Sequence, residues 1–161
     1  MKALRYKKNA SMIHKNVIKN NFFLFTLVLS SIGIISMVLS IMVYASIGNV
    51  SNICTINSYV SCKKVDSSSY GSLFVHMPNG LFATILFILV SLFSYMYIRF
   101  KKMIFLITNL TLLLAAGIIG VYLLNVELNL IHGICLLCMI SFISILLLIF
   151  VNYREIDKAI S

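Results

Sequence analysis

The sequence predicts an all-α integral membrane protein: a bundle of four transmembrane helices with an outer, cysteine-containing loop between the first two. Three observations support this fold class. Of the 161 residues, 61% are hydrophobic and only 11% are charged, whereas soluble domains carry roughly a quarter charged residues. The apolar residues gather in four charge-free stretches, each long enough to cross a bilayer. Lys and Arg collect in the segments that would share one side of the membrane.

The first two apolar stretches enclose the predicted cysteine loop. A basic and polar segment, residues 1–21, precedes the first stretch, 22–47. The loop, residues 48–79, contains Gly, Asn, Ser and two cysteines. Pro78 stands just before the second stretch, 80–98, where its missing N–H costs nothing, because the first turn of a helix leaves N–H groups unpaired. We therefore expect a helix to begin directly after this proline.

The last two stretches follow after a tight basic turn, residues 99–102. The third stretch is 103–124, and a short polar connection, 125–133, separates it from the fourth, 134–151. Residues 152–161 form a polar tail.

Positive charge predicts the orientation. The N-terminal segment, the basic turn and the C-terminal tail carry six, three and two of the 13 Lys and Arg residues, 11 in all, whereas the opposite side has only Lys63 and Lys64. Residues 22–151 would then form a multi-pass domain in the cell membrane. The positive-inside rule puts both termini of the chain in the cytoplasm and the cysteine loop on the outer side of the membrane. The positive charge then reflects orientation and attraction to membrane lipid, and no nucleic-acid partner is expected.

All four cysteines lie on the predicted outer side: Cys54 and Cys62 in the loop, Cys135 and Cys138 at the start of the fourth helix. Disulfides persist in such an oxidising compartment. A disulfide between residues three apart closes a very small loop and stabilises little, but the first turn of a helix favours the reactive thiolate. The Cys-x-x-Cys pair therefore indicates redox chemistry. For Cys54 and Cys62 alone, a structural disulfide is an equally good interpretation.

Two non-catalytic interpretations remain open from the residues alone. The four cysteines could together ligate a zinc ion, but only one Cys-x-x-Cys is present where such sites usually bring two, so no metal is expected. The cysteines could also form structural disulfides in a non-enzymatic membrane protein. Nearby polar residues have ordinary interpretations: His132 as an interfacial residue, Glu127 as a solvated loop carboxylate and Asn79 as a helix cap.

Several motifs, taken in order, resemble the vitamin K epoxide reductase family over about residues 25–150. Cys54 and Cys62 have the family's eight-residue separation, and CKKVDSSSYG (62–71) is similar to its run of Cys, Val, Ser-Ser and aromatic-Gly. NGLF (79–82) resembles the start of the second helix. VYLL (121–124), followed by Cys-x-x-Cys, resembles the third helix and the active-site helix. Each motif is weak alone, but their order and spacing are specific.

The resemblance implies a membrane thiol:quinone oxidoreductase that makes disulfides outside the cytoplasm. Because the chain ends about ten residues after the last stretch, we expect it to lack the thioredoxin-like domain that is fused to many bacterial members of the family. A separate thioredoxin-fold, DsbA-like protein would therefore reduce the loop disulfide at Cys54, and Cys62 would then exchange with Cys135. Cys138 would pass electrons to a quinone in the bundle, such as menaquinone or ubiquinone. Each protein step is a thiol–disulfide exchange, which needs an attacking thiolate and an accessible sulfur.

The resemblance also implies three ligand-binding positions. Asn79 would hydrogen-bond a quinone carbonyl, and Ser68 falls on the family's functional serine. Phe142 stands where vertebrate members have a tyrosine. A phenyl ring packs on a quinone but cannot donate a hydrogen bond, which affects epoxide reduction more than simple quinone reduction. Because Cys135, Cys138 and Phe142 lie at i, i+3 and i+7, they share one helix face.

A DsbB-like oxidase of another family is the rival within the same chemistry. That family also combines four helices with a quinone, but its Cys-x-x-Cys lies in the first outer loop. The order of the cysteines is reversed in this chain, so we rank this alternative second.

Overall fold

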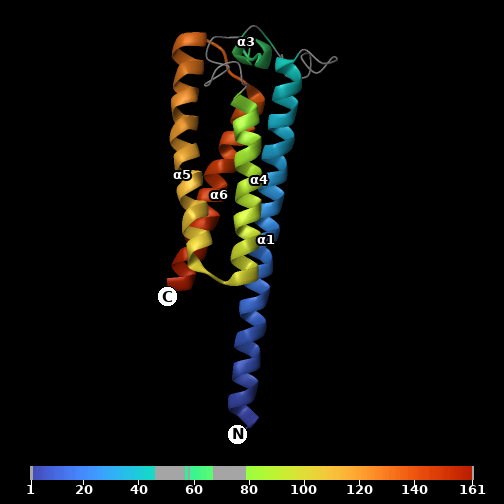
Figure 1. The fold of residues 1–161 in the computed structure, drawn as a ribbon, viewed down its shortest axis with the longest axis vertical. Helices are drawn as coiled ribbons and strands as arrows, with labels where there is room; N and C mark the ends of the chain where they lie inside the picture. The colour runs from blue at the N-terminus through green and yellow to red at the C-terminus, as the bar shows by residue number, and fades with distance from the viewer. Residues whose placement is uncertain (1, 46–56, 58, 67–78, 161) are drawn as a thin grey trace.

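The computed structural model describes residues 2–45, 57, 59–66 and 79–160, which form a bundle of long helices (Figure 1). Its elements in chain order are α1 (Lys2–Tyr44), α3 (Cys62–Asp66), α4 (Asn79–Phe100), α5 (Met103–Val126), the π-helical η1 (Glu127–Ile131) and α6 (Leu136–Ile160). Among the described residues, four helical segments are long and apolar enough to cross a membrane: Phe22–Tyr44, Asn79–Phe100, Met103–Ile131 and Leu136–Ile160. The predicted four-helix transmembrane bundle is confirmed.

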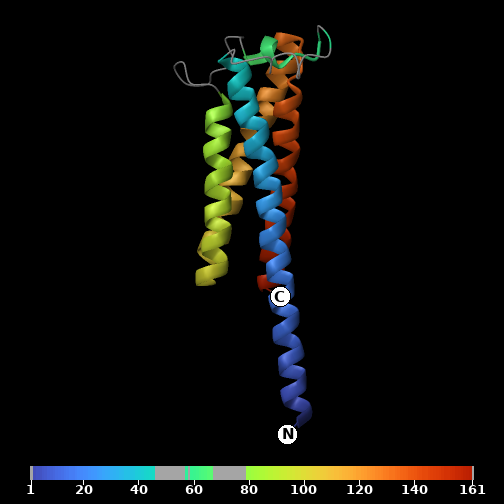
Figure 2. The same cartoon turned by 90° about the vertical axis from the view of Figure 1, so that its right-hand side faces the viewer.

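The two ends of the bundle differ in what they carry. The turn between α4 and α5 lies at the same end as the C-terminus, and α1 extends beyond the other helices there (Figures 1 and 2). We call this the turn end. The opposite end, which carries α3, is called the loop end. At the turn end Lys101 adopts a left-handed backbone (φ 54°), and its N–H donates to the carbonyl of Tyr97 at 2.8 Å. This ends α4 sharply and lets α5 begin at Met103.

Helices continue further than hydropathy predicted. α1 runs through the basic segment from Lys2, and α6 runs through the predicted tail to Ile160. Neither extension contains Gly or Pro, the two residues that most disfavour a helix interior. Hydropathy identifies what can lie in lipid, whereas backbone hydrogen bonding continues as long as the residues are good helix formers.

Most of the predicted polar connection, residues 125–133, is also helical. η1 continues α5 directly, and the helix ends only where His132 takes a left-handed backbone (φ 49°). The last helix then begins at Leu136 instead of residue 134, because Ile134 pairs with Val60 in a parallel bridge. The connection between the last two helices is therefore much shorter than the polarity of its residues suggested.

Each long helix packs mainly on two neighbours: α1 and α5 both pack on α4 and α6. The middle of the bundle holds a cluster of buried apolar side chains from all four: Leu29, Met37, Phe87, Val90, Leu113, Ile145 and Leu148. Gly33 of α1 makes room for this core, because a Cβ at that position would lie 2.4 Å from the Phe87 ring. The outward faces are largely apolar and exposed, as expected of helices that face lipid.

A buried polar cluster joins three helices near the turn end. The side-chain amide of Asn109 on α5 donates to Ser94 Oγ on α4 at 2.9 Å and to Asn152 Oδ1 on α6 at 3.1 Å. All three residues are fully buried. Asn152 in turn donates to the carbonyl of Leu148 at 2.8 Å. Because water cannot satisfy polar groups inside a bilayer, such mutual bonding holds the helices together.

Replacing Asn109 with alanine should destabilise the bundle. The change removes two interhelical hydrogen bonds and leaves Ser94 and Asn152 with lost partners, which we expect to lower the free energy of unfolding by about 1–2 kcal/mol. Thermal unfolding in detergent measures the change. Thr111→Ala is the matched control, because Thr111 is exposed on the same helix and, within the described part of the chain, its hydroxyl bonds to the carbonyl of Ile107 in its own helix. Equal stability of the two variants would contradict the role of Asn109 in holding the three helices together.

Candidate functional site

A short backbone pairing brings the cysteine loop onto the start of α6. Val60 and Ile134 form an isolated parallel bridge. The Ser61 N–H donates to the Ile134 carbonyl at 3.2 Å, and the Ile134 N–H donates to the Tyr59 carbonyl at 2.9 Å. Lys64 Nζ adds a bond to a backbone carbonyl of the α5–α6 connection at 3.0 Å. The loop residues that precede α3 are thereby fixed against the residue that precedes Cys135.

Local side-chain bonds shape the loop before Cys62. Asn57 Oδ1 accepts the N–H groups of Tyr59 and Val60 at 2.9 and 2.7 Å. Ser61 Oγ then accepts the Lys64 N–H at 3.4 Å, which caps α3. Asn and Ser favour such turns and caps because their short side chains reach nearby backbone N–H groups. Cys62 is therefore the first residue of a short capped helix and not part of an irregular loop.

Cys62 and Cys135 are in direct sulfur contact. Cys62 is disulfide-bonded, whereas Cys135 and Cys138 carry thiols. Cys135 Sγ lies 3.3 Å from Cys62 Sγ, well beyond the bonded distance of about 2.05 Å but close enough for attack. Both residues are fully buried. A thiol that touches a disulfide sulfur is the arrangement that thiol–disulfide exchange requires.

The sequence predicted that Cys135 lies in the first turn of the last helix. In the structure it is instead the N-cap of α6, directly before Leu136. Its carbonyl accepts the Met139 N–H at 3.0 Å, and its sulfur accepts the Cys138 N–H at 3.3 Å. The N-terminus of a helix carries partial positive charge, and Cys135 lies at that end of α6. The helix therefore supports the reactive sulfur through a direct hydrogen bond as well as through its dipole.

Glu127 holds the backbone of Cys135. The expectation of a solvated loop carboxylate was wrong: Glu127 is 5% exposed, and its Oε2 accepts the Cys135 N–H at 3.1 Å. The reason is that the helix continues through η1, which turns this side chain inward where a loop would have left it in water. An acidic residue in the otherwise weakly polar run VELNLI, at the predicted membrane edge, was the available signal.

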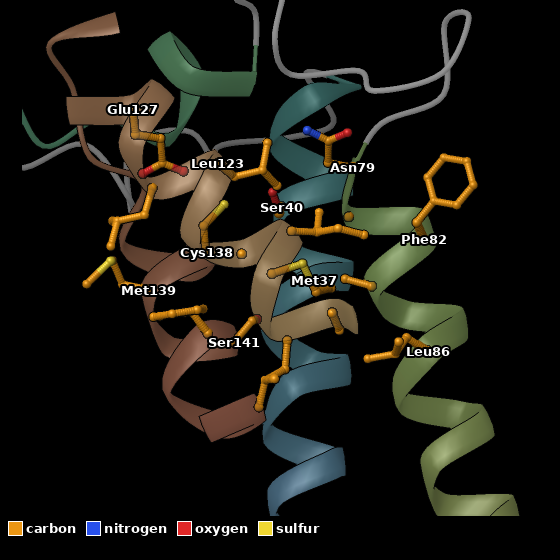
Figure 3. Close-up of a pocket in the computed structure, with 18 of the residues that line it drawn as sticks. Met37, Ser40, Asn79, Phe82, Leu86, Leu123, Glu127, Cys138, Met139 and Ser141 are labelled. Atoms are coloured by element: carbon orange, nitrogen blue, oxygen red, sulfur yellow. The ribbon is translucent and has the colours of Figure 1, made fainter. Parts of the chain in front are cut away.

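A cavity of about 300 Å³ opens beside the cysteines, between the four long helices (Figure 3). Most of its lining is apolar. The polar residues that line it are Ser40, Asn79, Glu127, Cys138 and Ser141. Its apolar wall includes Phe142, which fits into space left by Gly120, because a Cβ on Gly120 would lie 2.6 Å from the phenyl ring.

The structure brings together some of the predicted site residues. Asn79, Cys138 and Phe142 line the same cavity, and Cys135 joins Cys138 to Cys62. Two other predicted residues, Cys54 and Ser68, lie outside the described residues. Glu127 and Ser141 also line the cavity, although neither was predicted from the sequence to do so.

The lining fits a quinone head group. Ligand cavities are typically mostly apolar with a few convergent polar groups, and about 300 Å³ is the lower end of their usual size. A quinone has an apolar ring with carbonyl oxygens that accept hydrogen bonds, and it needs a reductant nearby. The cavity offers apolar walls, an amide at Asn79, a hydroxyl at Ser141 and the thiol of Cys138.

Replacing Glu127 should disturb the sulfur contact in a way that depends on the substitute. In a protein that also carries Cys54→Ser and Cys138→Ser, Cys62 and Cys135 are the remaining thiols and should form a disulfide under mild oxidation. Glu127→Gln keeps an oxygen acceptor and should preserve the rate. Glu127→Ala leaves the buried Cys135 N–H unpaired, a cost of about 1–3 kcal/mol, and should slow the reaction about fivefold or more.

The rate is measured by gel mobility after quenched oxidation. Asn129→Ala is the control on η1, because Asn129 is exposed and, among the described residues, its side chain bonds to Asn125 at the end of α5 and not to the cysteine site. A Glu127→Ala protein that crosslinks as fast as Asn129→Ala would show that Glu127 does not position Cys135.

Comparison with known proteins identifies the family. The model described as "Vitamin K epoxide reductase family" matches residues 24–153, which is most of the chain and includes all four cysteines. No curated protein matches the chain significantly. The match covers the four membrane-crossing helices and leaves out only the polar ends of α1 and α6. This chain therefore belongs to the vitamin K epoxide reductase family, whose activity is thiol–disulfide oxidoreduction in the membrane.

Proposed function

We propose that the protein is a thiol:quinone oxidoreductase that takes two electrons from a thioredoxin-fold protein outside the cytoplasm and passes them to a membrane quinone. Family membership supports the broader activity, since the family works on quinone-type substrates. The observation that carries the specific proposal is the 3.3 Å contact between the Cys135 sulfur and the disulfide-bonded Cys62 sulfur, next to a cavity lined by Cys138.

The first transfer oxidises the protein partner. A thiolate of a separate, DsbA-like protein attacks the sulfur of Cys54 in a Cys54–Cys62 disulfide, forming a mixed disulfide and releasing the Cys62 thiolate. The second cysteine thiolate of the partner then attacks the sulfur of the partner's first cysteine in that mixed disulfide and releases Cys54 as a thiolate. The net result is one new disulfide in the partner and two thiols in the loop, so that two electrons have entered the protein.

The second transfer moves these electrons to the helix pair. The Cys62 thiolate attacks Cys135 of a Cys135–Cys138 disulfide and releases the Cys138 thiolate. Cys54 then attacks Cys62 in the mixed disulfide, restores the loop disulfide and leaves Cys135 reduced. The contact between Cys62 and Cys135 supports this step because their sulfurs, 3.3 Å apart, already touch and need to approach by only ~1.2 Å to bond. The N–H of Cys138 on Cys135 Sγ stabilises negative charge on that sulfur when it leaves.

The cavity residues hold the electron acceptor. A bound quinone would accept two electrons and two protons as the Cys135–Cys138 dithiol becomes a disulfide. Asn79 would donate a hydrogen bond to a carbonyl oxygen and stabilise charge that develops there. Phe142 would pack its ring against the acceptor without donating a hydrogen bond. Ser68 retains the ligand-binding role that the family resemblance implies.

A Cys54→Ala variant should separate the two halves of the relay. Dithiothreitol can reduce a Cys135–Cys138 disulfide directly, so this variant should still reduce quinone with dithiothreitol. It should fail with a reduced DsbA-like protein as the donor, because the partner has no sulfur to attack. Cys135→Ala and Cys138→Ala should lose both activities. Quinone absorbance with detergent-purified protein measures each rate.

Two results would contradict the proposal. Equal loss of both activities in Cys54→Ala and Cys135→Ala would exclude the two-step relay. A wild-type protein whose count of alkylatable thiols does not change after quinone is added would indicate structural disulfides in a non-enzymatic protein.

We also propose that both termini are cytoplasmic and that the loop end faces outside, as the distribution of Lys and Arg predicts. In a parent with all four cysteines replaced by serine, single cysteines can be placed at the two ends of the bundle. Asn129→Cys at the loop end should react with an impermeant maleimide in intact cells. Lys102→Cys at the turn end should react only after the cells are opened. Labelling of Lys102→Cys from outside would reverse the orientation.

A further inference from the structure

One hydroxyl in the cavity lacks a bonding partner. Ser141 on α6 is 2% exposed, and its Oγ has no hydrogen-bond partner in the described part of the chain. Other polar side chains of this helix satisfy themselves: Ser144 bonds to the Ile140 carbonyl at 2.9 Å, and Asn152 bonds to the Leu148 carbonyl at 2.8 Å. A buried polar group without a partner is unfavourable and calls for a physical reason.

The remaining polar side chains that line the cavity differ from Ser141 in this respect. Ser40, Asn79, Glu127 and Cys138 each take part in an interaction within the protein. Among the polar residues of the described chain that line the cavity, Ser141 is the one whose buried side-chain oxygen has no hydrogen-bond partner in the protein. It lies three residues after Cys138 on α6, so its side chain is a direct neighbour of the reactive thiol on the same helix face.

Asn79 and Ser141 lie in different parts of the cavity wall. Asn79 begins α4 near the loop end, whereas Ser141 lies deeper, on α6 (Figure 3). Most of the other residues that line the cavity are apolar. A quinone ring carries two carbonyl oxygens that each accept hydrogen bonds, so two donors from separate helices match its chemistry better than one.

We infer that Ser141 is a quinone-binding residue, whose hydroxyl donates a hydrogen bond to a carbonyl oxygen of the acceptor. This inference rests on the proposed function and deepens it. It also supplies a donor next to Phe142, whose ring has none. The serine hydroxyl rotates freely and both donates and accepts, so it can follow the carbonyl oxygen through reduction to a hydroxyl group without moving the helix.

A second unpartnered hydroxyl shows how the prediction can be tested. Ser30 on α1 is also buried at 1% exposure and lacks a hydrogen-bond partner among the described residues, but it does not line the cavity. If unpaired hydroxyls in this bundle are merely tolerated, Ser30→Ala and Ser141→Ala should behave alike. If Ser141 binds the quinone, only Ser141→Ala should change quinone affinity.

Menadione, a naphthoquinone without a long tail, is a suitable probe. Its binding is measured as the increase in thermal unfolding temperature of purified, air-oxidised protein, in which the cysteines cannot reduce it. We expect Ser141→Ala to weaken menadione binding about three- to tenfold, the effect of one hydrogen bond. Without menadione, the same variant should unfold at the wild-type temperature or higher, because it removes an unpaired buried hydroxyl.

Four further variants serve as controls for the Ser141→Ala measurement. Ser144→Ala, on the same helix but outside the cavity, and Ser30→Ala should bind menadione like wild type. Ser141→Thr keeps the hydroxyl and should restore much of the affinity. Asn79→Ala, already proposed to bind the quinone, should also weaken binding. With dithiothreitol as the donor, Ser141→Ala should raise KM for menadione more than it lowers kcat.

The outcomes separate this inference from the proposed function. If wild type binds and reduces menadione but Ser141→Ala binds it as tightly as Ser30→Ala does, the inference is wrong and the oxidoreductase proposal stands. A lower unfolding temperature in Ser141→Ala with unchanged menadione affinity would assign the residue to packing and also overturn the inference. If wild type neither binds nor reduces menadione, both proposals fall.

Discussion

The pairing of Val60 with Ile134 is the constraint on which the site depends. Cys62 follows Val60 by two residues and Cys135 follows Ile134 directly, so this register sets how far apart the two sulfurs lie. A slip of one residue would shift the strand by about 3.3 Å, as much as the whole distance between the sulfurs. Helix packing alone could not impose such a contact, because α3 is only five residues long. Backbone hydrogen bonds therefore control the chemistry of the loop end, and Glu127 secures the α6 side of the same junction.

The surroundings change along the proposed electron path. Cys62 and Cys135 are sealed from solvent, which protects their exchange from other thiols and disulfides that would otherwise compete. Cys138 is only partly buried and lines a largely apolar cavity. The bundle below supplies a rigid frame, since the polar cluster at Asn109 ties three helices at the far end. In the proposed mechanism, thiol–disulfide exchange at Cys135 and quinone reduction at Cys138 can thus take place three residues apart at the start of α6 without interfering with each other.

Much of this arrangement could be predicted from the sequence. Charge-free stretches identified the four spans. The i, i+3, i+7 spacing put Cys135, Cys138 and Phe142 on one helix face; in the structure Cys138 and Phe142 line the cavity, whereas Cys135 precedes α6 and contacts Cys62. The exact start of α6 could not be predicted, because it depends on Ile134 pairing with a distant segment. Glu127 was misplaced because polar residues at a membrane edge look like a loop whether or not the helix continues. Ser141 escaped notice because periodicity shows which way a side chain faces, not whether its hydroxyl finds a partner. The roles of Cys54 and Ser68 stay predictions.

The N-cap bond of Cys135 couples secondary structure to redox energetics. Its sulfur accepts the Cys138 N–H, and it does so best as a thiolate, whereas a disulfide sulfur is a poorer acceptor. Oxidation of the Cys135–Cys138 pair, as proposed, would therefore weaken the cap, and by thermodynamic linkage the helix would favour the reduced form by the same free energy. A cap is worth about 1 kcal/mol, which corresponds to about 20 mV for a two-electron couple. In the proposed relay, the helix end would thus raise the reduction potential of the cysteine pair and favour electron transfer from the loop, and the first turn of α6 would be less firmly held when the pair is oxidised.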